Sequence, residues 1–325
     1  MKILTFNHHE SYIATLANTG YRFDVVIRKG NLDLSWNTRA RNVPHNVTLV
    51  NFDPETRQKL RQGAYDVVIC HTIKNLFWVW LFFKPRYIFI AHIPLFAHTS
   101  IQRIKSLAKK WLWALFKSTH RAQFFAVSYF KLKSWGENAP YAVLAPGEFP
   151  PLRQTDQPSD VLIVCNNLKE RGEELGIEMI NRMAEKAPIR VVGNNPGISF
   201  NTRPENFAHF QKLVTGFSIY LYTIKMPWGD GYNTAMLEAM RMGMAVITVE
   251  NPSSPIIHGV NGLVGKTEEE LLEHIYRLRA DTELVKKLGK AAIQTIERDF
   301  SEANFIRVWR SIIDPESLVQ KAPAG

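Results

Sequence analysis

Residues 228–240 have the sequence Trp-Gly-Asp-Gly-Tyr-Asn-Thr-Ala-Met-Leu-Glu-Ala-Met. The part from Thr234 onward is rich in Ala, Met, Leu and Glu, which favour helix, and the two glycines before it permit a tight turn. Asp230 and Asn233 are candidate caps of this predicted helix. Because free backbone N–H groups at a helix start bind anions, the segment predicts a diphosphate site. The residues expected to bind the diphosphate are Gly231, Tyr232, Asn233 and Thr234.

Glu238 lies two turns into the predicted helix, where its carboxylate could accept hydrogen bonds from sugar hydroxyls. An ordinary capped helix is the alternative, because many α/β proteins have a Gly-Asp-Gly turn before a helix. The segment resembles the E-x7-E motif of retaining glycosyltransferases of family 4, which have the GT-B fold. Asp230 stands at the first Glu of that motif and Glu238 at the second. The resemblance implies that both are catalytic-site residues, with Asp230 holding hydroxyls of the donor sugar and Glu238 those of the ribose.

The length and composition indicate the number of domains, the class of protein and its compartment. A chain of 325 residues is long enough for two domains, and its hydrophobic fraction of 46% is that of a globular protein. Cys70 and Cys165 both lie in apolar runs, which indicates a reducing compartment rather than a disulfide framework. Residues 1–6 lack the features of a signal peptide. We therefore expect a cytoplasmic protein.

Charge is distributed unevenly along the chain. Residues 1–150 contain 20 Lys and Arg against 8 Asp and Glu, a net charge of +12, whereas residues 151–325 contain 20 against 22. Between Asp66 and Glu137 there are 11 basic residues and no acidic one. Such a field attracts polyanions, namely anionic lipid, nucleic acid or a phosphorylated glycan. No RNA-binding motif accompanies the charge, so we expect no nucleic-acid partner.

Short apolar runs alternate with amphipathic helical patterns, which is typical of parallel α/β folds. Strands are predicted at 2–6, 23–27, 47–50, 66–70, 87–91, 124–127, 141–144, 161–165, 189–192, 219–222, 245–248 and 262–264, and helices include 173–186 and 268–279. The Pro-rich segment 145–159 is the best candidate linker. The predicted fold is α/β, with two doubly wound Rossmann-like domains facing each other across a cleft, and ligands are expected at the carboxyl ends of the strands.

The domains expected are an acceptor-side domain at 1–150 and a nucleotide-sugar-binding domain at 151–305. The resemblance adds a terminal helix at 306–325 that returns to the first domain. The sequence has no G-x-G-x-x-G, no Walker A motif and no zinc-ligand spacing, which disfavours dinucleotide dehydrogenases and P-loop NTPases. It also has no D-x-D motif, so we expect no obligatory metal and no cofactor.

The family resemblance extends to residues 164–172, Val-Cys-Asn-Asn-Leu-Lys-Glu-Arg-Gly. In the family this segment carries an Arg and then a Lys-Gly pair, and both cations hold the donor diphosphate. Asn166 stands at the Arg position and Arg171 at the Lys position, so one cation is missing. Lys169 or Lys225 could supply the second charge.

Three further segments resemble the family in order and spacing. Residues 191–196 contain Gly193 and are similar to the turn that shapes the nucleotide pocket. Residues 255–264 are similar to a stretch ending in Gly-x-Asn-Gly, with Pro255 where most members have Glu. Residues 300–309 are similar to the start of the terminal helix.

Histidines follow the predicted strands of the first half. His92 comes after the apolar run 87–91, where family members often place a histidine near the donor sugar and acceptor, and it is the third catalytic candidate. A structural role is the alternative for each histidine. Residues 8–10 follow the first strand in place of the family's Gly-Gly loop, and metal binding there stays an open alternative. The acceptor-side candidates are His8, His9, Glu10, His71 and His98.

Residues 101–117 form a basic amphipathic pattern. Its apolar stripe consists of Ile101, Ile104, Leu107, Ala108, Trp111 and Leu115. Basic helices of this kind bind membrane interfaces, and a core helix is the alternative. The membrane-contact candidates are Lys105, Lys109, Lys110, Trp111, Trp113, Phe116 and Lys117. The apolar run 75–83 is too short to span a bilayer and is predicted to be core.

Together these features predict a glycosyltransferase that takes a sugar from a nucleoside-diphosphate sugar, with UDP and GDP not distinguished. The resemblance implies retention of configuration. The acceptor is expected to be a glycan or lipid-linked molecule, as in polysaccharide or lipopolysaccharide biosynthesis, and the protein to be peripheral on the inner face of the cell membrane. The alternatives are a non-catalytic GT-B protein that binds membranes or partners, and a sugar-nucleotide epimerase or phosphorylase.

Overall fold

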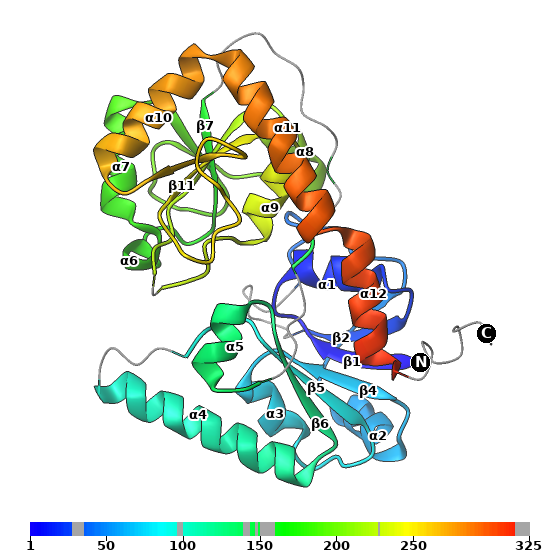
Figure 1. Ribbon diagram of the computed structural model, residues 1–325. Coiled ribbons are helices and arrows are strands. Elements are labelled where there is room, and N and C mark those ends of the chain that lie inside the picture. Colours follow the sequence, from blue (N-terminus) through cyan, green and yellow to red (C-terminus); the bar gives the residue numbers. More distant parts are fainter. Residues whose placement is uncertain are drawn as a thin grey trace, which may run out of the picture. The chain divides into compact units, whose positions relative to one another are not determined.

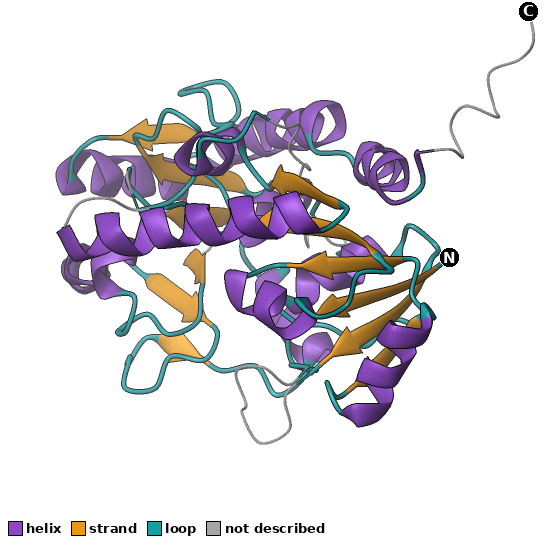
Figure 2. Cartoon of the chain, turned by 90° about the horizontal axis from the view of Figure 1, so that it is seen from below, coloured by secondary structure: helices purple, strands orange, loops and turns teal. Residues whose placement is uncertain are grey.

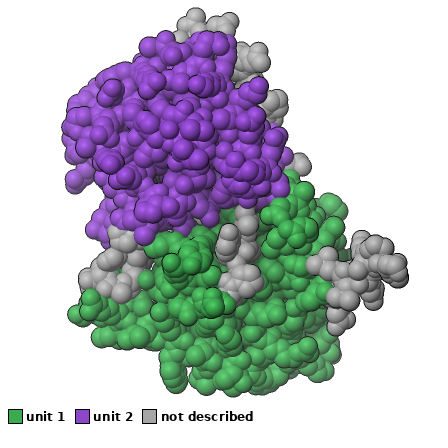
Figure 3. All heavy atoms as spheres, viewed as in Figure 1, with its two compact units in different colours: residues 1–144, 302–325 green, residues 145–301 purple. Residues whose placement is uncertain are grey.

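A computed structural model describes residues 1–27, 36–95, 100–138, 144–146, 149, 160–226 and 228–315. The chain divides into a first unit of residues 1–144 with 302–325 and a second unit of residues 145–301 (Figure 3). In each unit, strands of a parallel sheet alternate with helices (Figures 1 and 2). The predicted strand at 141–144 and most of the Pro-rich segment fall on residues outside the described ranges.

The first unit is a doubly wound sheet with the strand order β3-β2-β1-β4-β5-β6. All of its strand pairs are parallel. Its strands are β1 (Lys2–Phe6), β2 (Arg22–Val26), β3 (Val47–Val50), β4 (Val67–Cys70), β5 (Arg86–Ala91) and β6 (Ala122–Ala126). Its helices are α1 (Glu10–Ala17), α2 (Pro54–Gln62), α3 (Ile73–Val79), α4 (Ser100–Thr119), α5 (Tyr129–Trp135) and α12 (Glu302–Ile313).

The second unit repeats this topology, with the strand order β12-β11-β10-β7-β8-β9. Its strands are β7 (Val161–Val164), β8 (Ile189–Val192), β9 (Asn201–Thr202), β10 (Ile219–Tyr222), β11 (Ala245–Val249) and β12 (Leu263–Gly265). Its helices are α6 (Gly172–Leu175), α7 (Ile177–Lys186), α8 (Phe207–Val214), α9 (Thr234–Arg241), α10 (Glu268–Ala280) and α11 (Thr282–Asp299). Both sheets are therefore wound as in dinucleotide-binding folds.

Buried side chains explain why the apolar runs form these elements. Strands β4, β10 and β11 are buried along their whole length, as expected for parallel strands that are covered on both faces. Helix α12 belongs to the first unit because Phe305 and Trp309 are buried there, with their rings 5.8 and 6.2 Å from the ring of Tyr12. Residues 302–313 thus complete a core whose first strand begins at residue 2.

Two details differ from the sequence-based prediction. The predicted helix at 173–186 is broken at Gly176, whose φ of 69° is left-handed, so that α6 and α7 are separate. The short edge strand β9 was not predicted, because two residues carry too little periodicity to be recognised.

Helix α11 packs unusually close to the end of α9. A Cβ atom on Gly289 would lie 1.9 Å from the carbonyl oxygen of Gly243, the residue that follows α9 in a left-handed conformation with φ 83°. No side chain larger than a hydrogen atom fits at that point. The absent side chain of Gly289 therefore sets the distance between α11 and the loop that leads into β11.

We expect Gly289→Ala to destabilise the second unit by about 2 kcal/mol or more, because of overpacking. In a helix interior the same change without crowding would stabilise by up to about 1 kcal/mol, so the sign of the effect is diagnostic. Urea denaturation measures the change in the free energy of unfolding. Lys290→Ala, at the exposed neighbouring position, is the matched control and should change stability by less than about 0.5 kcal/mol. A stabilised Gly289→Ala variant would contradict the close packing.

Candidate functional site

In each unit the candidate residues follow the strands at which the strand order reverses. In the second sheet these strands are β7 and β10, which are direct neighbours, and the loops after them carry Arg171 and Asp230. In the first sheet they are β1 and β4, which are followed by His8 and His71. Doubly wound sheets bind ligands outside the carboxyl ends of their strands at such a point. The prediction from sequence thus places residues of both units at the expected edge of their own sheet.

A side chain caps one of the backbone N–H groups at the start of α9. Asn233 has an extended backbone, and its side-chain oxygen accepts a hydrogen bond from the amide of Met236 at 2.8 Å. The amides of Thr234 and Ala235, the first two of the helix, have no hydrogen-bond acceptor among the residues that the structure describes. Two N–H groups therefore remain for an anion at this helix start.

Gly231 is fixed by a neighbouring loop. Its amide donates a hydrogen bond to the side-chain oxygen of Ser253 at 2.7 Å, so this N–H is already used within the protein. A Cβ atom on Gly231 would lie only 2.4 Å from the backbone nitrogen of Ser254. The glycine is therefore required by the close approach of two backbones, a role that its place before a helix did not reveal.

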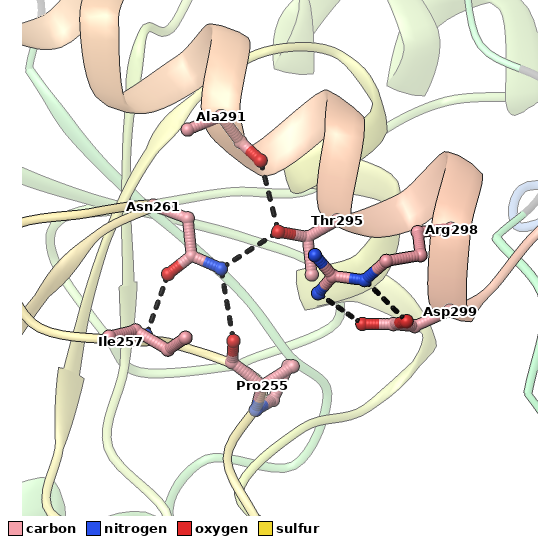
Figure 4. A network of polar contacts seen from close by, with 7 residues as sticks. All are labelled: Pro255, Ile257, Asn261, Ala291, Thr295, Arg298 and Asp299. Carbon is pink, nitrogen blue, oxygen red and sulfur yellow. Dashed lines mark hydrogen bonds and ion pairs between the residues drawn. The ribbon is translucent and has the colours of Figure 1, made fainter.

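Asn261 holds this loop against α11 (Figure 4). Its side chain, 2% exposed, accepts a hydrogen bond from the amide of Ile257 at 2.7 Å. It also donates to the carbonyl of Pro255 at 3.0 Å and to the hydroxyl of Thr295 at 2.9 Å. The loop that crosses Gly231 is thereby attached to α11. This buried network explains the Gly-x-Asn-Gly segment in physical terms.

Arg171 and Asp230 lie in one polar cluster at the ends of β7 and β10. The guanidinium of Arg171 binds the carboxylate of Glu174 in a bidentate way, at 3.1 and 2.5 Å. The hydroxyl of Tyr222 donates to the backbone carbonyl of Asp230 at 3.0 Å. Burial, with repulsion from Tyr220 and Asp230, raises the pKa of Tyr222, so it stays a neutral donor. Asp230 itself is 2% exposed.

The other predicted donor residues of the β7 loop have structural partners. The side-chain oxygen of Asn166 accepts a hydrogen bond from the amide of Asn194 at 2.7 Å. A Cβ atom on Gly193 would lie 1.9 Å from the carbonyl of Cys165, which explains this glycine by packing. Asn166 and Gly193 together fix the loop after β7 to the loop after β8. Their contact with a nucleotide stays a prediction.

Glu238 lies on the inner side of α9 and is 5% exposed. It lines a cavity of about 10 Å³, together with Val164, Tyr220 and Ala235. Such a space holds about one water molecule and is too small for a ribose. The role of Glu238 towards a ribose therefore stays a prediction that requires this side of α9 to open.

Three histidines of the first unit form one cluster. Nδ1 of His71 is 2.9 Å from Nε2 of His92, and Nε2 of His71 is 2.9 Å from the hydroxyl of Thr5. The ring of His8 lies 4.5 Å from that of His92, and the ring of Tyr12 meets His92 edge-on at 4.8 Å. Sequence reasoning missed Thr5 and Tyr12. The only available signal was that both flank the end of β1.

The hydrogen bonds show which ring nitrogens of His71 and His92 carry a proton. The hydroxyl of Thr5 donates to the carbonyl of Ile69 at 3.2 Å, so it accepts from Nε2–H of His71. Nδ1 of His71 then accepts from Nε2–H of His92. Nδ1 of neutral His92 is consequently the unprotonated nitrogen and can accept a hydrogen bond from a ligand.

All three imidazoles are neutral at pH 7. Burial, with repulsion from His9 and Lys131, lowers the pKa of His8 to about 4. Burial and then the charge of His8 lower the pKa of His71 and of His92 well below the ordinary value. The cluster is therefore suited to accepting and orienting hydroxyl groups and does not act as a cation near neutral pH.

The remaining acceptor-side candidates are less closely placed. His9 is the exposed residue before α1, and Glu10 accepts hydrogen bonds from the side chain of Asn7 at 3.0 Å and the amide of Asn37 at 3.1 Å. His98 lies outside the described residues. In the described part of the chain, no group of three or more His, Cys, Asp or Glu residues, the histidine cluster included, is arranged so that it could hold a metal ion.

The membrane-contact candidates divide between two faces of α4. Lys105, Lys109, Trp111 and Lys117 are exposed and Lys110 is half-buried. Trp113 and Phe116 are 2% and 0% exposed, and the prediction of membrane contact for these two is wrong. They pack against the aromatic core of the first sheet, where Trp113 lies 5.3 Å from Phe89. No helix among the described residues is both long and apolar enough to cross a bilayer.

We expect the free energy of unfolding to decrease as the pH falls, because of the histidine cluster. The free imidazole pKa is about 6.5, and the folded value for His8 is about 4, so folding excludes a proton in this window. The contribution of the cluster to the free energy of unfolding is therefore fully present above pH 6.5 and decreases as the pH falls to 4. His8 alone contributes up to roughly 3 kcal/mol. His8→Gln should flatten the dependence in urea denaturation from pH 4 to 7.5, whereas His45→Gln, at an exposed position, should not. A wild-type curve that is flat across this range would contradict the account.

We expect Asn261→Ala to destabilise the second unit by about 2–4 kcal/mol, because it leaves the amide of Ile257 and the carbonyl of Pro255 without their partner. Chemical denaturation measures the change. Asn194→Ala, at an exposed position of the same unit, is the control and should stay within about 0.5 kcal/mol of wild type. Equal stability of both variants would show that the loop is not held by Asn261.

Comparison with known proteins identifies the fold. No protein-family model and no curated protein matches the sequence. Among solved structures, sucrose-phosphate synthase from Thermosynechococcus elongatus is similar with a TM-score of 0.69 and 13% identity, over 99% of this chain and 100% of that one. HepE from Anabaena, in complex with UDP and glucose, has a TM-score of 0.69 and 14% identity over 99% and 100% of the two chains.

The lipopolysaccharide outer core galactosyltransferase WaaB is also similar, with a TM-score of 0.60 and 15% identity over 96% of this chain and 99% of that one. At these identities the likeness concerns the fold. The two parallel-sheet α/β units of the chain have the GT-B fold of these glycosyltransferases.

Proposed function

We propose that the protein is a glycosyltransferase that takes a sugar from a nucleoside-diphosphate sugar. The observation that carries this proposal is the start of α9, where two amides without an acceptor lie at the point of strand reversal in the second sheet. An anion is the ligand that such a helix start selects. HepE, which has the same fold, was crystallised with UDP-glucose, and a sugar nucleotide supplies a diphosphate.

Charge decides how the leaving diphosphate is stabilised. When the bond between the anomeric carbon and the β-phosphate oxygen breaks, negative charge develops on the diphosphate, and preorganised N–H groups stabilise it most. The amides of Thr234 and Ala235 are two such donors. Arg171 is the cation that the sequence predicts for the diphosphate, and its guanidinium would exchange Glu174 for phosphate oxygens. Lys169 and Lys225 are both exposed and could add a second charge.

The carboxylates and the histidine cluster complete the proposal. Asp230 would hold hydroxyls of the donor sugar, and Glu238 would hold those of the ribose once this side of α9 opens. His92 would accept a hydrogen bond at Nδ1 from a hydroxyl of the sugar or of the acceptor. The acceptor oxygen forms the new bond to the anomeric carbon as the bond to the β-phosphate oxygen breaks, its proton passes to the leaving diphosphate, and the nucleoside diphosphate departs. We further propose that the reaction retains the anomeric configuration and requires no metal ion.

The excess of basic residues in the first unit supports an anionic acceptor or surface. We propose a glycan or lipid-linked acceptor and a peripheral position on the inner face of the cell membrane. A non-catalytic GT-B protein and a sugar-nucleotide epimerase or phosphorylase are the competing functions. The non-catalytic alternative is favoured by the departures from the family pattern at Asn166, Asp230 and Pro255.

A screen of nucleoside-diphosphate sugars separates these functions. We expect one sugar nucleotide to raise the thermal midpoint of the protein and to release free nucleotide, with transfer when the acceptor is supplied. Arg171→Ala should weaken binding about 10-fold or more, since it removes charge-assisted hydrogen bonds. Arg190→Ala, an exposed arginine of the same unit, should leave binding unchanged.

The outcomes of this screen are distinct. Binding without transfer or hydrolysis would favour the non-catalytic alternative, and a change of the sugar without release of nucleotide would favour an epimerase. Activity that is lost in a chelator and restored by manganese would contradict the metal-independent reaction. Turnover that persists in Arg171→Ala with unchanged KM would remove Arg171 from the site.

A further inference from the structure

Helix α4 turns an apolar face towards solvent. Ile101, Ile104, Leu107 and Trp111 are 65–67% exposed, and Leu115 is 37% exposed. Their spacing of three or four residues places them on one stripe of the helix. The side chains that anchor α4, Trp113 and Phe116, lie on a different face and are buried. The helix therefore packs on the first unit through Trp113 and Phe116, and its larger apolar stripe faces solvent.

This outer stripe is unusual for a protein surface. A core helix hides its apolar stripe, and exposed clusters of large apolar residues mark interaction sites. In Figure 1, α4 runs along the outside of the first unit, beyond α3. The stripe was predicted from sequence with a core helix as the alternative, and its exposure contradicts that alternative for this face.

Basic side chains flank the stripe, and α4 contains no acidic residue. Arg103, Lys110 and Lys117 recur every seven residues along one side of it, and Lys105 lies on the other side. Lys117 also forms an ion pair with Glu137 at 3.1 Å. An apolar stripe bordered by cations fits the boundary between acyl chains and anionic headgroups.

A second group of exposed apolar side chains lies at the end of α3. Phe77 is 53%, Leu81 77% and Phe83 61% exposed, at and just after α3. The ring of Phe83 stacks at 4.6 Å on that of His120, which directly follows α4. Helices α3 and α4 are also in contact. The first unit therefore has a second group of exposed apolar side chains, which packs beside the end of α4.

We propose that the outer stripe of α4 is the surface by which this protein lies on an anionic lipid bilayer. The helix lies parallel to the membrane, with Ile104, Leu107 and Trp111 inserted between headgroups and its lysines at the level of the phosphates. Nucleic acid does not fit, because large aliphatic residues occupy the centre of the surface. The inference goes beyond the proposed transferase activity, since it holds for a chain that transfers no sugar.

Vesicle flotation tests the proposal with the full chain. We expect binding to vesicles of phosphatidylcholine and phosphatidylglycerol at 7:3, and at least 10-fold weaker binding to phosphatidylcholine alone. The double variant Leu107→Glu/Trp111→Glu should lose at least 10-fold in vesicle binding. Ile257→Glu/Val260→Glu, at residues 58% and 54% exposed in the second unit, is the matched control and should bind as wild type does.

Three outcomes would overturn the proposal. These are absence of wild-type binding to the anionic vesicles, equal binding by both double variants, and concentration-dependent dimers in sedimentation velocity that only the α4 variant abolishes. Circular dichroism checks that the exposed substitutions leave the fold intact. Sugar-nucleotide binding by the α4 variant should equal that of wild type, so a failure of vesicle binding and a failure of the proposed transferase are told apart.

Discussion

The close approach of the 253–255 loop to Gly231 is the constraint on which the candidate donor site depends. With a Cβ at Gly231 the two backbones could not meet, and without the Asn261 network the loop would not be held against α11. This contact fixes Asp230 and the chain entering α9, and Asn233 then begins the helix with an extended backbone. The direction of the Thr234 and Ala235 amides follows from these contacts. The proposed binding of a diphosphate is thus linked to packing more than 20 residues away in the sequence.

The first unit uses a different principle. Its candidate site consists of neutral imidazoles, with His71 buried and His8 and His92 partly buried, and the unprotonated nitrogen of this hydrogen-bonded series is Nδ1 of His92. Positive charge, in contrast, is concentrated on the outside, where α4 contributes no acidic residue. A neutral site suits hydroxyl groups, and a basic surface suits anionic headgroups. The two proposed functions are therefore separated within one unit by burial.

Local sequence patterns predicted much of this structure because they report on local physics. Apolar runs identified the strands, and the run after Asn233 identified α9. The histidines and Arg171 were predicted as site residues because ligands of parallel sheets bind at the carboxyl ends of the strands. Other features depend on contacts between distant residues, which no local pattern contains. The constraint on Gly231 comes from Ser254, the cavity beside Glu238 comes from Tyr220 and Val164, and the burial of Trp113 comes from Phe89. Only the three-dimensional packing separates the two faces of α4.

A single backbone N–H group at the start of α9 tests the central claim most directly. Thr234 is the first residue of the helix, where proline is tolerated, and Asn233 before it already has the extended backbone that proline requires, with φ −143° and ψ 177°. Thr234→Pro therefore removes one amide hydrogen, and Thr234→Ala controls for the side chain. Calorimetric titration with the sugar nucleotide that binds wild type should show about 10-fold weaker binding for Thr234→Pro than for Thr234→Ala. Equal affinity of the two variants, with both folded, would contradict a diphosphate held by this helix start.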